Sequence, residues 1–265
     1  MSELFSYGFM KNAFIAILII APSLGIIGTM VVQRQMAYFS DALGHSALTG
    51  IAIGTILGVT APTLSMVCFG IVFALVLNHI KFNARASVDT LISVCASTSL
   101  ALGLAILSKG GNFSKYSALL VGDVLSINSE ELPILAVCTA ATLIYYAISA
   151  NALAATGIHP TLAKSSRIRI TLTDDLFAIV TAILVMLSIR WIGVLLINAM
   201  LILPAASARN IAHNMRQYHI YTLIIALFSG LLGLFVSYYT NVATGPVIVI
   251  YAGLIYFATY IKSKN

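Results

Sequence analysis

An aspartate and a histidine stand four residues apart at the start of an otherwise uncharged stretch, residues 38–58, with the sequence YFSDALGHSALTGIAIGTILG. On an α-helix, residues i and i+4 lie one above the other on the same face, so Asp41 and His45 would project together. A carboxylate and an imidazole placed in this way can ligate one divalent cation. The alternative is a structural Asp–His hydrogen bond. Ionisable groups are rare within membrane segments and usually functional, which favours a cation path.

Three glycines follow the histidine at the same four-residue spacing: Gly50, Gly54 and Gly58. Glycine has no side chain, so a stripe of glycines along one helix face lets the backbone of a second helix come close. We therefore expect a helix-packing seam along this face. Under the structural alternative, this seam and the Asp–His hydrogen bond are all that the stretch provides.

The composition excludes a soluble protein. Of the 265 residues, 60% are hydrophobic and only 8% are charged, whereas soluble domains carry about 25% charged residues. Because lipid cannot satisfy backbone hydrogen-bonding groups, a chain this apolar is predicted to be an all-α, polytopic integral membrane protein. The formal net charge of +6 comes from lysines and arginines that concentrate in short connections. That pattern belongs to membrane topology and not to nucleic-acid binding.

Hydrophobic runs divide the chain into nine candidate membrane spans within a single domain, residues 1–265. They cover residues 12–32, 41–58, 61–80, 88–108, 132–150, 170–189, 191–206, 220–239 and 245–261. The runs 41–58 and 191–206 are short for a bilayer core of about 30 Å at about 1.5 Å per helical residue. We therefore expect eight or nine transmembrane helices, one or two of which are short or broken.

The distribution of positive charge favours nine spans. With the C-terminus in the cytoplasm, nine spans place ten lysines and arginines on the cytoplasmic side and four on the other side. The N-terminus is then extracytoplasmic. Eight spans would move the first connections to the opposite face and weaken this asymmetry.

A second informative stretch joins an apolar run to basic residues. Pro204 is followed by small residues and then by Arg209, His213 and Arg216. The proline is predicted to break the membrane span, and the helical spacing of the basic residues predicts a short amphipathic helix over residues 204–216, outside the membrane. Such a helix can press into a soluble partner. The alternative is an ordinary basic connection.

Three further acidic residues each leave two interpretations open. Asp123 either attracts a cation at the outer mouth of the path or caps a turn. Asp174 and Asp175 either form a second cation stop or lie at the membrane interface near a helix N-terminus, where carboxylates are favoured. The sequence contains no G-x-x-x-x-G-K-[ST] phosphate loop and no H-E-x-x-H zinc motif. The chain is therefore not expected to hydrolyse ATP or peptide bonds by itself.

Four stretches, in family order, resemble the permease subunits of metal-importing ABC transporters, the zinc/manganese/iron uptake family. They are residues 33–54 (QRQMAYFSDALGHSALTGIAIG), 88–108 (VDTLISVCASTSLALGLAILS), 192–212 (IGVLLINAMLILPAASARNIA) and 237–253 (SYYTNVATGPVIVIYAG). The resemblance extends over residues 10–260. Residues 120–132, LVGDVLSINSEEL, look most like the zinc-uptake members, whose equivalent stretch also carries Gly-Asp and an acidic pair.

The resemblance implies a non-catalytic permease of the bacterial plasma (inner) membrane that carries a divalent transition metal into the cytoplasm. Zinc is favoured and manganese is next, as transported ions and not as permanent cofactors. The expected assembly is a permease homodimer with two cytoplasmic ATPase subunits and an extracytoplasmic metal-binding protein that delivers the ion. The alternative is an ion-coupled secondary metal carrier that works without an ATPase.

The same resemblance assigns roles to residues. Asp41 and His45 would line the translocation path. The segment after the proline would be a cytoplasmic coupling helix in a groove of the ATPase, with the contact residues Pro204, Ala205, Ala206, Arg209, Asn210 and His213. A coupling helix separates the two hypotheses, because a secondary carrier has no ATPase to contact.

Overall fold

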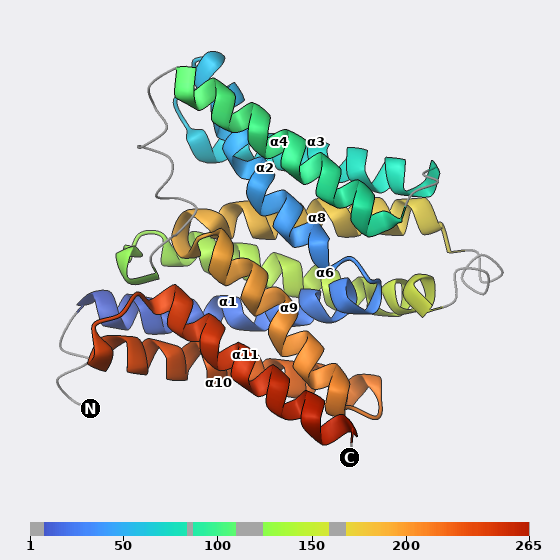
Figure 1. Cartoon of the computed structure of the whole chain (residues 1–265), viewed down its shortest axis with the longest axis vertical. Coiled ribbons are helices and arrows are strands. Elements are labelled where there is room, and N and C mark those ends of the chain that lie inside the picture. Colours follow the sequence, from blue (N-terminus) through green and yellow to red (C-terminus); the bar gives the residue numbers. More distant parts are fainter. Residues whose placement is uncertain (1–7, 84–86, 110–123, 159–167, 265) are drawn as a thin grey trace. The chain divides into compact units, whose positions relative to one another are not determined.

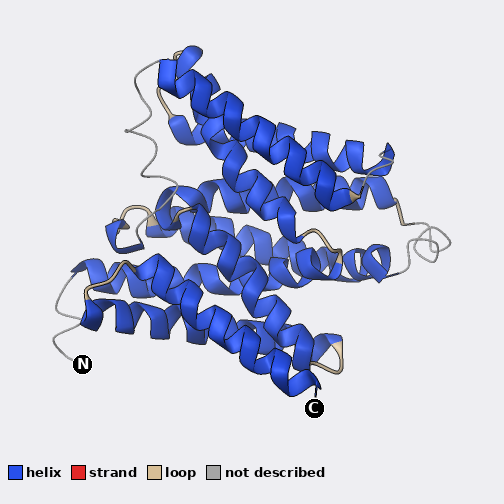
Figure 2. Cartoon of the chain, in the orientation of Figure 1, coloured by secondary structure: helices blue, strands red, loops and turns tan. Residues whose placement is uncertain are grey.

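The structure is a computed structural model that describes residues 8–83, 87–109, 124–158 and 168–264. These residues are nearly all helical, and no strand occurs among them (Figure 2). The α-helices within these ranges (Figure 1) are α1 (Gly8–Gln33), α2 (Ala37–Ile56), α3 (Pro62–Asn83), α4 (Val88–Lys109), α6 (Leu132–Ile158), α8 (Ile170–Ile192), α9 (Val194–Ile211), α10 (Met215–Thr240) and α11 (Thr244–Lys264), and a short 3₁₀ helix, η2, covers Val124–Ser126. The predicted all-α fold is confirmed.

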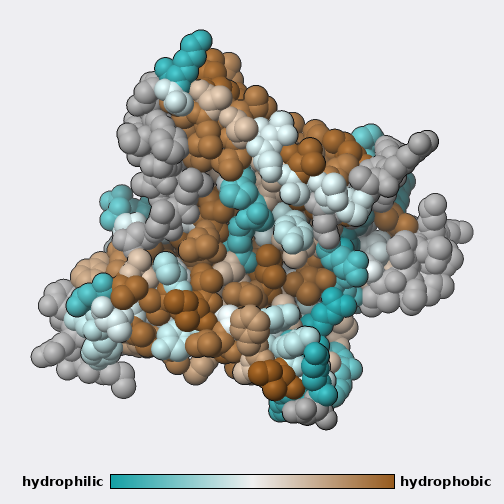
Figure 3. All heavy atoms as spheres, in the orientation of Figure 1, coloured by the Kyte–Doolittle hydropathy of each residue, from teal (hydrophilic) through white to brown (hydrophobic). Residues whose placement is uncertain are grey.

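Eight of the described helices are long and apolar enough to cross a membrane, and α2 falls outside this group. α2 contains an aspartate, a histidine and several serines, threonines and glycines, which lower its hydropathy below that of the eight candidate spans. Figure 3 shows that apolar residues cover much of the visible surface, as contact with lipid requires. The predicted polytopic membrane fold with eight or nine spans is confirmed, and α2 is the short helix that makes the two counts differ.

The described helices form two compact units, each of which is considered by itself. The first unit is Met1–Val32, Val121–Ile148 and Trp191–Asn265, within which α9, α10 and α11 pack against one another. The second unit is Gln33–Leu120 and Ser149–Arg190, within which α2 packs against both α3 and α4. In each trio the first helix is the shortest, with 20 residues in α2 and 18 in α9.

Small residues bring α2 into backbone contact with both of its neighbours. A Cβ atom on Gly50 would lie only 2.9 Å from a backbone Cα of α3, and one on Gly54 would overlap the side chain of Ser65. On the other side, a Cβ on Gly103 of α4 would lie 2.7 Å from the backbone nitrogen of Thr49. The second unit is therefore held together at positions where glycine lets two backbones approach closely.

Gly58 does not extend this seam, and the expectation that it does is wrong. α2 ends at Ile56, and Gly58 lies in the turn that follows, with a φ of 70° and open space where a Cβ would stand. A positive φ is easily adopted only by glycine. Gly58 therefore serves the turn between α2 and α3, and the seam is limited to Gly50 and Gly54.

In the first unit, Pro204 lies inside α9 and does not end the span, which corrects the prediction of a separate helix over residues 204–216. α9 continues to Ile211, and α10 already begins at Met215. The backbone hydrogen bond lost at a proline is tolerated in a membrane helix that packs against neighbours, here α10 and α11. The four residues after the proline are Ala-Ala-Ser-Ala. Because alanine is the strongest helix former, α9 continues past the proline.

Replacing Gly54 by leucine should destabilise the protein, because the new side chain would need the space that Ser65 occupies. Overpacking of this kind costs about 1–3 kcal/mol. The matched control is Gly253→Leu on α11, where nothing lies within 4 Å of the Cβ position. Thermal unfolding in detergent, followed by circular dichroism, should show a lower midpoint for Gly54→Leu alone. Equal midpoints for the two variants would mean that α2 and α3 are not in close contact.

Candidate cation-binding site

Asp41 and His45 lie one turn apart on α2. Nε2 of His45 is 3.5 Å from Oδ2 of Asp41, a separation at the outer edge of hydrogen bonding. The side chain of His45 is 36% exposed and that of Asp41 is 47% exposed. The two groups are close enough to bind one ion and open enough for an ion to reach them.

His45 presents Nε2, and not Nδ1, to Asp41. Nδ1 is buried and has no hydrogen-bond partner within the described parts of the chain, so an ion beside the Asp41 carboxylate would meet Nε2. In the tautomer whose proton is on Nδ1, Nε2 carries a lone pair. A neutral imidazole nitrogen of this kind is a ligand for zinc and other transition metals.

The opposite wall of the site comes from α4. A cleft of about 170 Å³ opens between α2 and α4, which is room for roughly five water molecules at about 30 Å³ each. Its lining residues are Tyr38, Asp41 and His45 on α2 and Ile92, Ser93, Ala96, Ser97 and Leu100 on α4. Three hydroxyl groups therefore stand beside the Asp–His pair, and a cation bound there can keep part of its water shell.

A buried contact one turn beyond His45 fixes α4 against α2. The hydroxyl of Thr49 donates a hydrogen bond to the backbone carbonyl of Ser99, and the hydroxyl of Ser99 donates to the Thr49 hydroxyl at 3.1 Å. Both residues are buried. Asp41 and His45 share the cleft with residues 92–100 of α4, and further along α2 Thr49 meets Ser99 and Gly103, so the two helices run parallel. The Thr49–Ser99 contact sets their register beside the site.

The donor set is incomplete for a structural metal site. No group of three or more His, Cys, Asp or Glu side chains suited to a metal occurs among the residues that the structure describes. Structural zinc sites have four protein ligands, whereas Asp41 and His45 would supply half of that shell. Weak or multi-site binding is what conduction needs, because an ion that enters must also leave. The arrangement suits a passing ion better than a stored one.

The other acidic candidates do not form a second cation stop of the expected kind. Asp174 is buried and forms an ion pair with Arg34. Asp175 accepts a hydrogen bond of 2.6 Å from the amide of Asn78. Asp174 is only 7% exposed, so it does not lie at a solvated interface either. Its ion pair with Arg34 compensates for the burial of the carboxylate charge. Asp123 lies outside the described residues.

The structure places the six predicted coupling residues in different surroundings, with Asn210 half-buried. Pro204 and Ala205 are buried and Ala206 is half-buried, so all three take part in the packing of α9. Arg209 and His213 are exposed. Arg209 and His213, at the end of α9 and in the turn before α10, are thus the most accessible of the six.

Two residues at the end of α9 also hold it to its neighbours. Arg209 donates a hydrogen bond of 3.2 Å to the backbone carbonyl of Val32, near the C-terminus of α1. A cation is favoured at a helix C-terminus, where carbonyl groups point outward. The amide of Asn210 donates to the hydroxyl of Thr259 on α11 at 3.3 Å. The exposed turn is therefore firmly connected to the helices of the first unit.

Sequence reasoning missed the α4 wall and the burial of Arg34. Ser93 and Ser97 stand four residues apart in an apolar run, and this helical spacing was the available signal. For Arg34 no such signal exists, because a cation between two hydrophobic runs is interpreted as a connection at the cytoplasmic side. The side chain is in fact 5% exposed.

Comparisons with known proteins agree with one another. A sequence profile described as the ABC 3 transport family matches residues 6–263. The high-affinity zinc uptake system membrane protein ZnuB of Haemophilus influenzae is 33% identical over 243 residues, covering 90% of this chain and 92% of that protein. The manganese import system permease protein ScaB of Streptococcus gordonii is 28% identical and covers 97% of this chain and 92% of its own length. A chain in the structure of PsaBC from Streptococcus pneumoniae in complex with Fab superposes with a TM-score of 0.85 at 27% identity, covering 100% of this chain and 98% of that one.

Asp41→Asn and His45→Ala should each lower zinc accumulation by cells more than about tenfold, because each removes one of the two candidate ligands. The control is His79→Ala, which removes an exposed imidazole from α3. Accumulation of radioactive zinc is measured at limiting concentration and normalised to the amount of each variant in the membrane. Normal accumulation by both site variants would contradict the site.

Proposed function

The chain belongs to the ABC 3 transport family, and from that premise we propose that it is the permease subunit of an importer that moves zinc or manganese into the cytoplasm. One observation carries the proposal: the Asp41–His45 pair faces a cleft that has room for a partly hydrated cation. The chain is a multi-pass membrane protein, and the site lies on α2, which is not among the eight described candidate spans. The role of the chain is to bind and pass the ion, with no chemical step of its own.

Each group at the cleft has a distinct task in passing the ion. The carboxylate of Asp41 supplies the negative charge that offsets part of the lost hydration. His45 supplies a nitrogen ligand, and the hydroxyl groups of Ser93 and Ser97 can hold the water molecules that the ion retains. Because only two protein ligands bind directly, the ion can be released once the opposite side of the path opens.

Zinc is the favoured ion and manganese the second candidate. Imidazole is a good ligand for zinc, whereas manganese is bound mainly by carboxylate, carbonyl and water oxygens. His45 therefore supports zinc, while the oxygen-rich lining of the cleft is also compatible with manganese. The relative described as a zinc-uptake membrane protein is 33% identical to this chain, and the relative described as a manganese permease is 28% identical.

Separate ATPase subunits, two per complex, supply the energy for transport, since this sequence has no phosphate loop. The exposed turn between α9 and α10, including Arg209 and His213, is the proposed contact with the ATPase. α10 and α11 are consecutive helices joined by three residues. The C-terminus then lies on the same side as that turn, which is the cytoplasmic side of the bacterial inner membrane. A second permease copy and an extracytoplasmic metal-binding protein complete the proposed assembly.

The proposed importer and a secondary carrier differ in what drives transport. In proteoliposomes that contain the permease and its co-purified ATPase, zinc transport should require ATP on the side of the ATPase. Proteoliposomes with the permease alone should show no transport above empty vesicles when a proton or sodium gradient is imposed. Gradient-driven transport by the permease alone would overturn the proposal in favour of the carrier.

Charge reversal at the proposed ATPase contact should uncouple transport. Arg209→Glu should reduce both co-purification of the ATPase and ATP-dependent zinc transport, because an arginine charge pairs well with acidic groups on a partner. Arg209→Gln keeps a donor for the Val32 carbonyl and removes the charge, so it should show a smaller loss. Arg190→Glu, at the opposite end of the membrane in the nine-span topology, is the control. Normal co-purification and transport with Arg209→Glu would remove this contact from the proposal.

A further inference from the structure

The start of α2 is set by a very short connection. α1 ends at Gln33 and α2 begins at Ala37, so Asp41 lies about 6 Å along the axis of α2. The N-cap residue is Met36, which has no side-chain oxygen of the kind that caps helices. Contacts made by the connection with other helices therefore add to the contacts with α3 and α4 in fixing the height and rotation of α2.

Arg34, within this connection, makes such contacts while its side chain is 5% exposed. One terminal nitrogen forms an ion pair with Asp174 on α8. The other donates to the backbone carbonyl of Leu153 at 3.1 Å and to the hydroxyl of Thr156 at 2.5 Å, both on α6. The guanidinium also lies 5.0 Å from the centre of the Phe177 ring. The connection is thereby tied to two helices other than the two that it joins.

The contacts of Arg34 are better suited to positioning α2 than to stabilising the fold. Replacing a buried ion pair by apolar residues is often neutral or stabilising, so stability alone does not account for a charge on this connection. The planar guanidinium fixes both distance and direction through several donors, whereas a lysine would supply one mobile charge. Gln35, the next residue, has a φ of 56°, a conformation that is rare outside glycine. The backbone turns sharply here, and a shift of Arg34 would be transmitted to α2.

We propose that Arg34 is a positioning residue for the cation site. Through Asp174 on α8 and the end of α6, it holds α2 in the rotation that keeps Asp41 and His45 facing the α4 wall. Each helical residue corresponds to a rotation of about 100°, so a slip of α2 by one residue would turn both ligands out of the cleft. The inference rests on the proposed function for the identity of the site, while the contacts of Arg34 are independent of it.

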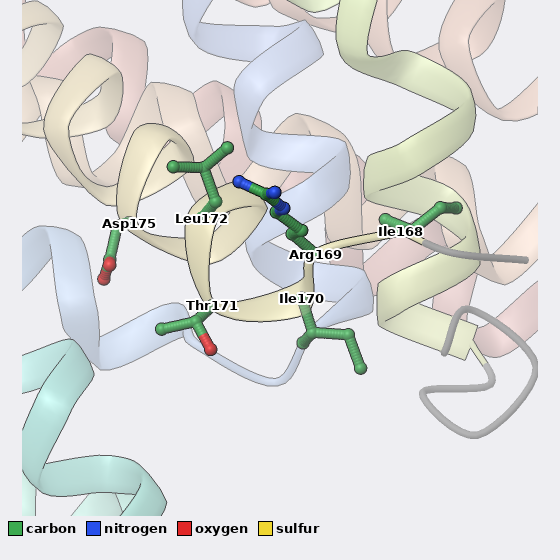
Figure 4. A pocket seen from close by; sticks show the side chains of 6 residues that line it. All are labelled: Ile168, Arg169, Ile170, Thr171, Leu172 and Asp175. Atoms are coloured by element: carbon green, nitrogen blue, oxygen red, sulfur yellow. The ribbon is translucent and has the colours of Figure 1, made fainter. Parts of the chain in front are cut away.

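Asp175 offers a matched control for Asp174. It is the next residue on α8, and its carboxylate accepts a hydrogen bond of 2.6 Å from Asn78 on α3, not from the connection that precedes α2. Asp175 lines a pocket of about 500 Å³ at the start of α8. Its carboxylate is directed away from the guanidinium of Arg169 (Figure 4). Asp175→Asn thus removes the same charge from the same helical turn and leaves the contact of Arg34 intact.

The test is binding of Mn²⁺ alone to the full-length protein in nanodiscs, read from the paramagnetic resonance signal of the free ion. Asp174→Asn should raise the Kd about tenfold, a size typical of groups that orient metal ligands, and Asp175→Asn should leave it unchanged. Asp174→Glu keeps the charge and should recover part of the affinity. Thr156→Val removes one acceptor of Arg34 with little change of shape, and should raise the Kd by less than Asp174→Asn. These two variants carry the test if Asp174→Asn does not fold.

An Asp41→Asn variant separates the failure of this inference from the failure of the proposed function. If Mn²⁺ binding does not depend on Asp41, the cation site is wrong. If binding depends on Asp41 but Asp174→Asn and Thr156→Val bind Mn²⁺ like the wild type, Arg34 does not position the site. Equal losses in Asp174→Asn and Asp175→Asn would also overturn the inference, since they would reflect general damage to α8.

Discussion

The cost of placing ionisable side chains inside a membrane protein is the constraint on which this structure depends. A charged group facing lipid is unfavourable, so Asp41 and His45 must face protein or water. Close helix packing makes this possible, because glycine lets α3 and α4 approach the backbone of α2 at Gly50 and Gly103. α2 can therefore be short and polar while α3 and α4, its longer and more apolar neighbours, pack against it.

That packing also explains why the site is incomplete. α4 contributes serine hydroxyls to the cleft and no further His, Cys, Asp or Glu, so direct binding of a cation would fall to one carboxylate and one imidazole. An ion in this site would be held by few protein ligands and by water, which is the condition for passage in a carrier protein. The same incompleteness would be a defect in a structural metal site.

Features that depend on residue spacing along one helix could be predicted from the sequence. Features that depend on contacts between distant segments could not. The short run 41–58 corresponds to α2, and the placement of Asp41 and His45 one turn apart needed only the helical period. Pro204 was expected to end a span, but packing against α10 and α11 lets α9 continue through it. The burial of Arg34 follows from contacts with α6 and α8 that lie more than a hundred residues away. No local pattern encodes such a contact.

X-ray absorption at the zinc edge, recorded on the zinc-loaded full-length protein, tests most directly whether the cation binds at this pair. The structure predicts one imidazole nitrogen at about 2.0–2.1 Å with oxygen atoms completing the shell, and loss of the imidazole scattering in His45→Gln. A sulfur shell at about 2.3 Å, or an imidazole signal that survives replacement of His45, would contradict the assignment of the site.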